Sequence, residues 1–286
     1  MDKKLVYVYA VMISLFIIAY PFMKSSATYL DDSNPKNKVV LLQNRCRPLA
    51  DRNIEDLQEI ERKQNKANII FTMDDGWESQ YTHAFQILNE KGMKGSIAVI
   101  PTKVGTDGYM TLSQLNTLYA SGWDLMNHTY SHLHLVNLSN KKQKKEFDQA
   151  RTWLNNHCFT RASDIAVYPY GSYNQDTLDI LQEEHFRSAR TIVDGIQSNQ
   201  LKKYEIRTIN LLPTTDIKWV KQEIDQAIQT KQTIVFTNHR FNKKPDAAQM
   251  NFDPGKFKTI VNYVDRKKDN LNILTYSEWL DVKGIR

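Results

Sequence analysis

The chain has 286 residues, of which 41% are hydrophobic and 24% are charged, and this composition excludes a disordered or acidic-tail protein. Its 10 glycines and 8 prolines are too few for a collagen-like or linker-rich chain. The net charge of +6 is mildly basic, and the one dense basic run is the four lysines within residues 141–145. That run opens an amphipathic helix pattern, so we interpret it as a solvated helix face and expect no nucleic-acid partner.

The amino terminus carries a targeting pattern. Lys3 and Lys4 precede an apolar stretch from Leu5 to Met23, which as a helix would span about 28 Å, the thickness of a hydrocarbon core. Residues 1–27 are therefore expected to be a transmembrane anchor with its amino end inside, or a signal peptide cleaved near Ser25-Ser26-Ala27. Both alternatives place the remaining chain at the extracellular face of the membrane or in the medium.

Polar residues 28–38 follow and are interpreted as a tether. The chain has only two cysteines, Cys46 and Cys158, which are too few for a disulfide framework and lack the spacing of metal ligands. Whether they pair with each other in an oxidising exterior is left open by the sequence.

Residues 39–286 contain no linker-like break and no internal repeat, so we predict one catalytic domain. Short β-rich runs alternate in it with runs of helical period, which predicts an α/β fold. The length and the alternation favour a distorted (β/α) barrel of seven to eight parallel strands, with helices outside, over an open sheet. The expected strands are 69–73, 96–100, 124–127, 165–168, 188–192, 206–212, 233–237 and 271–275, and the expected helices are 79–90, 112–119, 141–155, 176–184, 217–228 and 257–264.

Acids, histidines and a turn motif follow four of these expected strands. In a (β/α) barrel the reacting groups gather at the carboxyl ends of the strands, so we expect these residues to meet at one end of the barrel. They are Asp74, Asp75, His128, His132, the run Pro169-Tyr170-Gly171, and His239.

Several of these residues have the chemistry of a metal site. Adjacent carboxylates such as Asp74 and Asp75 repel each other unless a cation or separate protonation roles offset the cost, although Asp-Asp-Gly is also good turn sequence. If a helical turn follows the strand, His128 and His132 lie on one face. Two imidazoles with Asp75 would make an open catalytic metal site. His239 is a candidate general acid, because the unperturbed pKa of histidine lies near neutrality.

Four short motifs in this order resemble those of the polysaccharide deacetylases of the NodB-homology type, carbohydrate esterase family four. The resemblance extends over most of residues 67–280, and the residues that carry it are Thr72-Met73-Asp74-Asp75-Gly76, His128-Thr129-Tyr130-Ser131-His132, Tyr168-Pro169-Tyr170-Gly171 and Thr237-Asn238-His239.

The resemblance implies a role for each of these positions. Asp75, His128 and His132 would bind one divalent metal, usually zinc. Asp74 would be the general base and His239 the general acid, and the backbone at Tyr170 would help to hold the oxyanion.

The implied activity is removal of N-acetyl groups from N-acetylglucosamine units of a cell-surface polysaccharide, which could be an exopolysaccharide, peptidoglycan or a chitin-like oligomer. Two alternatives stay open: an O-acetyl esterase built on the same scaffold, and a catalytically silent carbohydrate-binding protein.

Two departures from the family pattern generate further expectations. The third motif usually begins with an arginine that tunes the base, and Val167 stands at that position. We predict that Arg207 supplies this charge to Asp74 instead. The family's own fourth motif, an aspartate with a nearby tryptophan, comes before the one that Thr237-Asn238-His239 resembles, and it is represented at best by Asp216 and Trp219.

Overall fold

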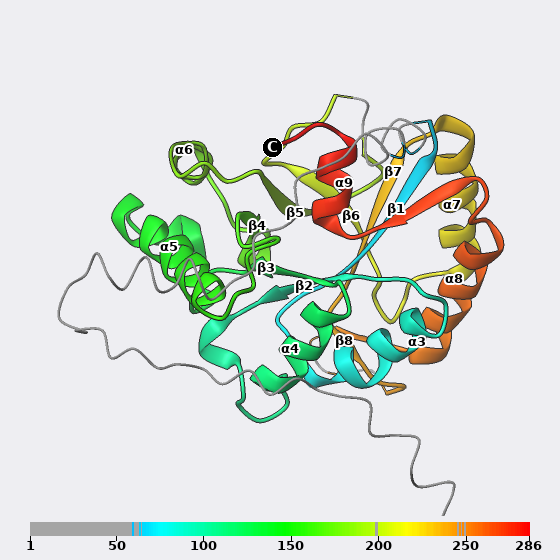
Figure 1. Ribbon diagram of the computed structural model, residues 1–286, viewed down its shortest axis with the longest axis horizontal. Helices are drawn as coiled ribbons and strands as arrows, with labels where there is room; N and C mark the ends of the chain where they lie inside the picture. The colour runs from blue at the N-terminus through cyan, green and yellow to red at the C-terminus, as the bar shows by residue number, and fades with distance from the viewer. Residues whose placement is uncertain are drawn as a thin grey trace, which may run out of the picture. The chain divides into compact units, whose positions relative to one another are not determined.

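A computed structural model describes residues 59, 63, 65–197, 200–244, 246, 248 and 250–286 (Figure 1). These residues belong to one unit of the chain, Arg47–Arg286. The predictions for residues 1–27, for the tether and for Cys46 lie outside the described residues. Within the part that is described, no helix combines the length and apolar character needed to cross a membrane.

Seven parallel strands form a closed barrel in the order β1 to β7, because β7 also pairs with β1. An eighth strand, β10, pairs with residues 67–70 of β1, whereas β2 meets only Thr72 and Met73 at the end of the same strand. Because β10 and β2 pair with different parts of β1, the barrel is distorted. The predicted fold class, a distorted (β/α) barrel of parallel strands, is confirmed. The strands are β1 Ala67–Met73, β2 Ser96–Val99, β3 Asp124–Asn127, β4 Ile165–Val167, β5 Ser188–Asp194, β6 Ile206–Asn210, β7 Thr233–Asn238 and β10 Leu271–Leu274.

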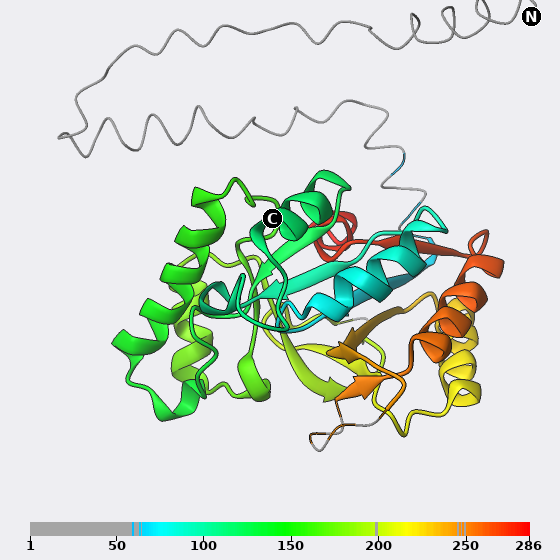
Figure 2. The ribbon, with the colours of Figure 1, turned by 90° about the horizontal axis from the view of Figure 1, so that it is seen from below.

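Helices connect the strands and cover the outside of the barrel. In Figures 1 and 2, α5 and α6 lie side by side on one flank, and α7 and α8 lie side by side on another. The predicted helix at 79–90 is a π-helix, η1, followed by the short α3. The helices are η1 Gln80–Phe85, α3 Gln86–Asn89, η2 Pro101–Lys103, α4 Leu112–Ala120, η3 Leu135–Asn137, α5 Asn140–Asn156, η4 Pro169–Gly171, α6 Gln175–Glu183, α7 Ile217–Thr230, α8 Pro254–Arg266 and α9 Tyr276–Val282.

Besides the single-turn helices η2, η3 and η4, the helix α9 and two two-residue strands were not predicted. The two strands, β8 (Arg240–Phe241) and β9 (Asn251–Phe252), pair with each other. The last helix, α9, packs Tyr276 and Trp279, both fully buried, against the residues that fill the amino end of the barrel.

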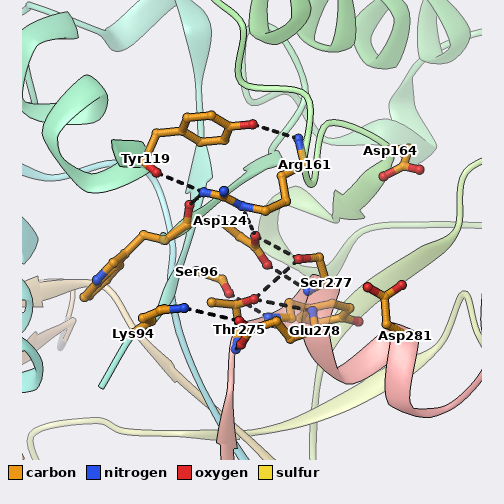
Figure 3. Close-up of polar contacts among 12 residues, drawn as sticks. Lys94, Ser96, Tyr119, Asp124, Arg161, Asp164, Thr275, Ser277, Glu278 and Asp281 are labelled. Atoms are coloured by element: carbon orange, nitrogen blue, oxygen red, sulfur yellow. Dashed lines mark hydrogen bonds and ion pairs between the residues drawn. The ribbon is translucent and has the colours of Figure 1, made fainter. Parts of the chain in front are cut away.

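A buried polar network holds α9 in this place (Figure 3). Asp124, the first residue of β3, accepts hydrogen bonds from the Ser277 backbone N–H at 2.7 Å and from the Ser277 hydroxyl at 2.9 Å. Arg161 Nε donates to the same carboxylate at 3.2 Å. Burial raises the pKa of Asp124, while these contacts act in the opposite direction. The helix α9 therefore closes the amino end of the barrel and is hydrogen-bonded there. A catalytic site is expected at the opposite, carboxyl end of the strands.

Candidate active site

A cavity of about 460 Å³ opens at the carboxyl end of the barrel. Six of the seven predicted site residues line it, as expected for side chains that follow parallel strands. The six residues are Asp74, Asp75, His128, His132, Tyr170 and His239. The seventh, Arg207, lines a separate cavity.

The predicted metal ligands come together in this cavity. Asp75 Oδ1 lies 3.3 Å from His128 Nε2 and 3.3 Å from His132 Nε2. One ligand atom from each of the three residues can be chosen so that all lie within 4.8 Å of one another. Asp75 Oδ1 is also buried and accepts no hydrogen bond from the described residues. A buried carboxylate oxygen without a donor, facing two imidazole nitrogens, is an arrangement that fits a divalent cation.

The two histidines converge by a different route from the one predicted. No helical turn follows β3; instead Thr129 and His132 both take left-handed backbone conformations with φ of 60°. The Asn127 side chain accepts from the Thr129 N–H at 3.0 Å, and Thr129 Oγ1 accepts from the His132 N–H at 3.1 Å. Ser131 is bonded to Glu146 of α5. These side-chain contacts bring the rings of His128 and His132 together. A helical turn, in which residues four apart lie on the same face, is not what does so.

The protonation of the histidines suits metal ligation. His128 Nδ1 lies 2.9 Å from the Val167 carbonyl, to which it donates, so Nε2 is the atom available to a metal. Burial lowers the pKa of His132, and the charge of His128 lowers it further, to about 4. Burial also acts to lower the pKa of His128, but its close approach to the Asp75 carboxylate and the charges of Asp74 and Asp75 outweigh this effect and raise the pKa. Binding of a cation would therefore displace a proton from His128.

The second carboxylate, Asp74, is buried and separate from the metal ligands. It forms an ion pair with Arg190, and its Oδ2 lies 3.9 Å from His239 Nε2. Burial alone would raise the pKa of Asp74, but the charges of Arg190, His128 and His239 outweigh it and lower the pKa. Asp74 is thus ionised at neutral pH.

A buried side-chain amide joins the two catalytic candidates. Gln80 Nε2 donates to the backbone carbonyls of both Asp74 and His239, the latter at 2.8 Å. The Asp74 N–H donates to the Asn238 carbonyl at 2.9 Å. These bonds hold the end of β1 against the end of β7. Gln80 is not among the predicted site residues, because its position near the start of a helix gives no sign of this contact.

The structure corrects the predicted partner of Asp74, which is Arg190 and not Arg207. On β6, Thr208 bonds to Thr237 and to the Val235 carbonyl inside the barrel. Because successive strand residues point to opposite faces, Arg207 points outward, where its Nε donates to the Asp194 carbonyl at 3.1 Å.

Arg190, on the neighbouring strand β5, is fully buried. The signal that could have identified Arg190 is a charged residue inside the otherwise uncharged run Ser188–Val193.

Tyr170 lies beside the metal ligands. Its backbone is left-handed, with φ of 58°, and its side chain is 55% exposed. The ring stacks on His134 at a centroid distance of 3.9 Å and lies 4.6 Å from the ring of His132. His134 is thus an exposed loop residue at the edge of the site.

The turn that positions Tyr170 depends on Gly171. Its φ is +67°, and an added Cβ would collide with the Ile192 side chain. We expect Gly171→Ala to lower the free energy of unfolding by about 1–2 kcal/mol for the left-handed backbone, and by about 1–3 kcal/mol more for the collision. Urea unfolding would measure the total loss of unfolding free energy.

Gly92→Ala is the matched control, because Gly92 has φ of +65° and nothing within 4 Å of an added Cβ. Equal losses in the two variants would contradict a role for the contact with Ile192.

The proposed match to a fourth motif does not belong to this site. Asp216 caps α7 by accepting from the Lys218 N–H at 2.9 Å, and Trp219 is 40% exposed on that helix. Neither residue lines the cavity.

Known proteins with similar sequences are polysaccharide deacetylases. The family model described as Polysaccharide deacetylase matches residues 61–189. The protein YxkH of Bacillus subtilis (strain 168), described as a polysaccharide deacetylase, is 26% identical over 153 residues. That alignment covers 54% of this chain and 54% of YxkH, so the chain matches about half the length of this relative.

Solved structures extend the similarity of fold. A Mycobacterium smegmatis protein described as a polysaccharide deacetylase has a TM-score of 0.60 at 14% identity, covering 84% of this chain and 95% of its own. A family 4 acetyl xylan esterase from Clostridium thermocellum, in complex with a cobalt ion, has a TM-score of 0.54 at 15% identity, with 77% and 93% covered. At these identities the two structures support the barrel fold.

Proposed function

We propose that the chain is a metal-dependent hydrolase that removes N-acetyl groups from N-acetylglucosamine units of a cell-surface polysaccharide, and its similarity to polysaccharide deacetylases over residues 61–189 supports this proposal. The observation that carries this proposal is the contrast between two adjacent carboxylates. Asp75 offers an unbonded oxygen to two imidazoles, whereas Asp74 is held ionised by Arg190 and lies beside His239. Two neighbouring acids with separate environments can perform separate tasks.

Asp75 Oδ1 and the Nε2 atoms of His128 and His132 would hold the cation, and we propose Zn²⁺ because two imidazoles and one carboxylate are a common open zinc set. When bound, the cation supplies a Lewis acid that polarises a carbonyl and lowers the pKa of water. The loop that carries the two histidines is held in place by hydrogen bonds from His128 Nδ1 to the Val167 carbonyl and from the Ser131 N–H to Glu146 of α5.

The remaining steps use the chain's own residues. Asp74 takes a proton from the water that attacks the acetyl carbonyl, and its ionised state at neutral pH suits this role. Protonated His239 gives a proton to the leaving nitrogen, which is required because an amide anion is a very poor leaving group. The backbone N–H at Tyr170 would donate to the developing oxyanion. The products are acetate and a glucosamine unit with a free amine.

An O-acetyl esterase is the second candidate, because the same residues could hydrolyse an ester and the acetyl xylan esterase of C. thermocellum shares the fold. His239, which lies 3.9 Å from Asp74, could protonate either leaving group. We favour the amide because an amine leaving group requires a general acid more strongly than an alkoxide does. We also propose that the protein is exported and acts at the cell surface, on the basis of the apolar residues 5–23.

Acetate release tests the proposal. Chito-oligomers, peptidoglycan, β-1,6-linked N-acetylglucosamine oligomers and acetylated xylan would be compared with and without a chelator. We expect acetate from at least one amide polymer, at a higher rate than from the ester, with loss on chelation and recovery when Zn²⁺ is added. Acetate release that persists in protein verified to be metal-free would contradict the mechanism. Faster release from xylan would favour the esterase, and no release from any polymer would favour a silent binding protein.

A further inference from the structure

Trp77 contacts the carboxylate of Asp75 from the side away from the histidines. Its indole Nε1–H donates to Asp75 Oδ2 at 2.8 Å, whereas Oδ1 of the same carboxylate faces His128 and His132. The two oxygens therefore have different partners. A carboxylate held by one oxygen cannot rotate freely about its Cβ–Cγ bond, and it presents the other oxygen alone to a cation.

The indole ring is itself fixed on both faces. The Tyr109 ring stacks on it at a centroid distance of 4.0 Å and an interplanar angle of 26°, and the Arg240 guanidinium lies 3.6 Å from the ring centroid. Both groups approach so closely that they must occupy opposite faces. An indole between an aromatic ring and a guanidinium is stabilised by stacking and by the cation–π interaction.

The three layers come from three different parts of the barrel. Trp77 follows β1, and an antiparallel bridge joins it to Tyr109, which follows β2. That bridge is extended by the Met110 N–H, which donates to the Gly76 carbonyl at 2.9 Å. Arg240 directly follows His239 in the sequence, and its Nη1 lies 3.9 Å from Asp246. The indole is thus clamped between segments that the barrel holds independently.

We propose that Trp77 is a positioning residue of the metal centre, which fixes Asp75 Oδ2 so that Oδ1 alone binds the cation. Tyr109 and Arg240 hold the indole in the orientation that this bond requires. The inference rests on the proposed metal-binding function. Groups that orient a metal ligand in this way typically contribute about 10–100-fold to metal affinity.

The test is Trp77→Phe, which keeps an aromatic ring between Tyr109 and Arg240 but removes the N–H. Zn²⁺ affinity would be measured by competition with a chromogenic chelator, starting from metal-free protein. The absorption spectrum of the Co²⁺ form would report the ligand geometry. We expect an affinity about 10–100-fold weaker than in the wild type, together with an altered Co²⁺ spectrum.

Tyr109→Phe is the matched control, because it keeps the stacked ring and leaves the bond to Asp75 intact; its Zn²⁺ affinity and Co²⁺ spectrum should equal those of the wild type. A Trp77→Phe protein that binds Zn²⁺ within twofold of the wild type, with an unchanged spectrum, would overturn the role of Trp77 alone. A wild-type protein that binds no metal would instead overturn the proposed metal-dependent function. Thermal melts of the metal-free variants would show that both are folded.

Discussion

Asp74→Asn is expected to lower kcat by about 10²–10⁴-fold, the usual contribution of a general base, while the protein retains its metal. The substituted amide can still accept a hydrogen bond from Arg190, but it cannot take a proton from water. The metal ligands Asp75, His128 and His132 are unchanged by the substitution. Acetate release would be measured under saturating substrate, with the metal content determined on the same samples.

The matched comparison is Asp75→Asn, which should lose metal and activity together, because it removes a charged ligand instead of the base. Circular dichroism would verify that both variants are folded at the assay temperature. An Asp74→Asn enzyme with bound metal and a kcat within tenfold of the wild type would contradict the assignment of Asp74 as the base.

Arg190→Gln is expected to move the acidic limb of the pH–activity profile to higher pH. In the native protein the Arg190 guanidinium holds the pKa of Asp74 below its ordinary value against the effect of burial. Without that charge, the effect of burial is opposed only by His128 and His239, so the pKa of Asp74 rises and the base becomes protonated at a higher pH than in the wild type. The profile of kcat/KM against pH measures this shift.

The same substitution should lower the free energy of unfolding by about 3–5 kcal/mol at neutral pH, because it leaves a buried charge without its partner. In the wild type, the lowered pKa of Asp74 means that its stabilisation is present above the unfolded pKa and is lost as the pH falls through the native pKa. In Arg190→Gln the native pKa of Asp74 would lie closer to the unfolded one, so the stability of the variant should depend less on pH in the acidic range than that of the wild type. Urea unfolding at several pH values measures both trends.

Arg207→Gln is the control for this pair of measurements. Arg207 binds the Asp194 carbonyl on the outside of the barrel, so its replacement should leave the acidic limb where it is in the wild type. A shifted limb in Arg207→Gln, or an unshifted one in Arg190→Gln, would contradict the assignment of Arg190 as the partner of Asp74.

The barrel and the grouping of Asp75 with the two histidines were predictable from the sequence for one physical reason. In a parallel barrel the carboxyl ends of all strands lie at one end, so Asp75 after β1 and His128 after β3 must approach each other once the strands are recognised. Exact loop geometry is not needed for that conclusion. For this reason the expected grouping of Asp75, His128 and His132 does not depend on whether a helical turn separates the two histidines.

Short elements were harder to predict, because a two-residue strand carries no periodicity. The strands β8 and β9 and the helix α9 form against partners distant in the sequence, such as Asp124 for α9. The backbone between the two histidines likewise depends on Glu146 of α5, a contact that no local pattern contains.

The sequence by itself determined that parallel strands bring two carboxylates and three histidines to one end of a barrel, because residue order and strand alternation are local properties. Only the tertiary structure decided which arginine meets Asp74 and which oxygen of Asp75 is left free. Those outcomes depend on the face to which each strand residue points and on contacts between separate loops: Arg190 points inward, Arg207 points outward, and Trp77 reaches Asp75.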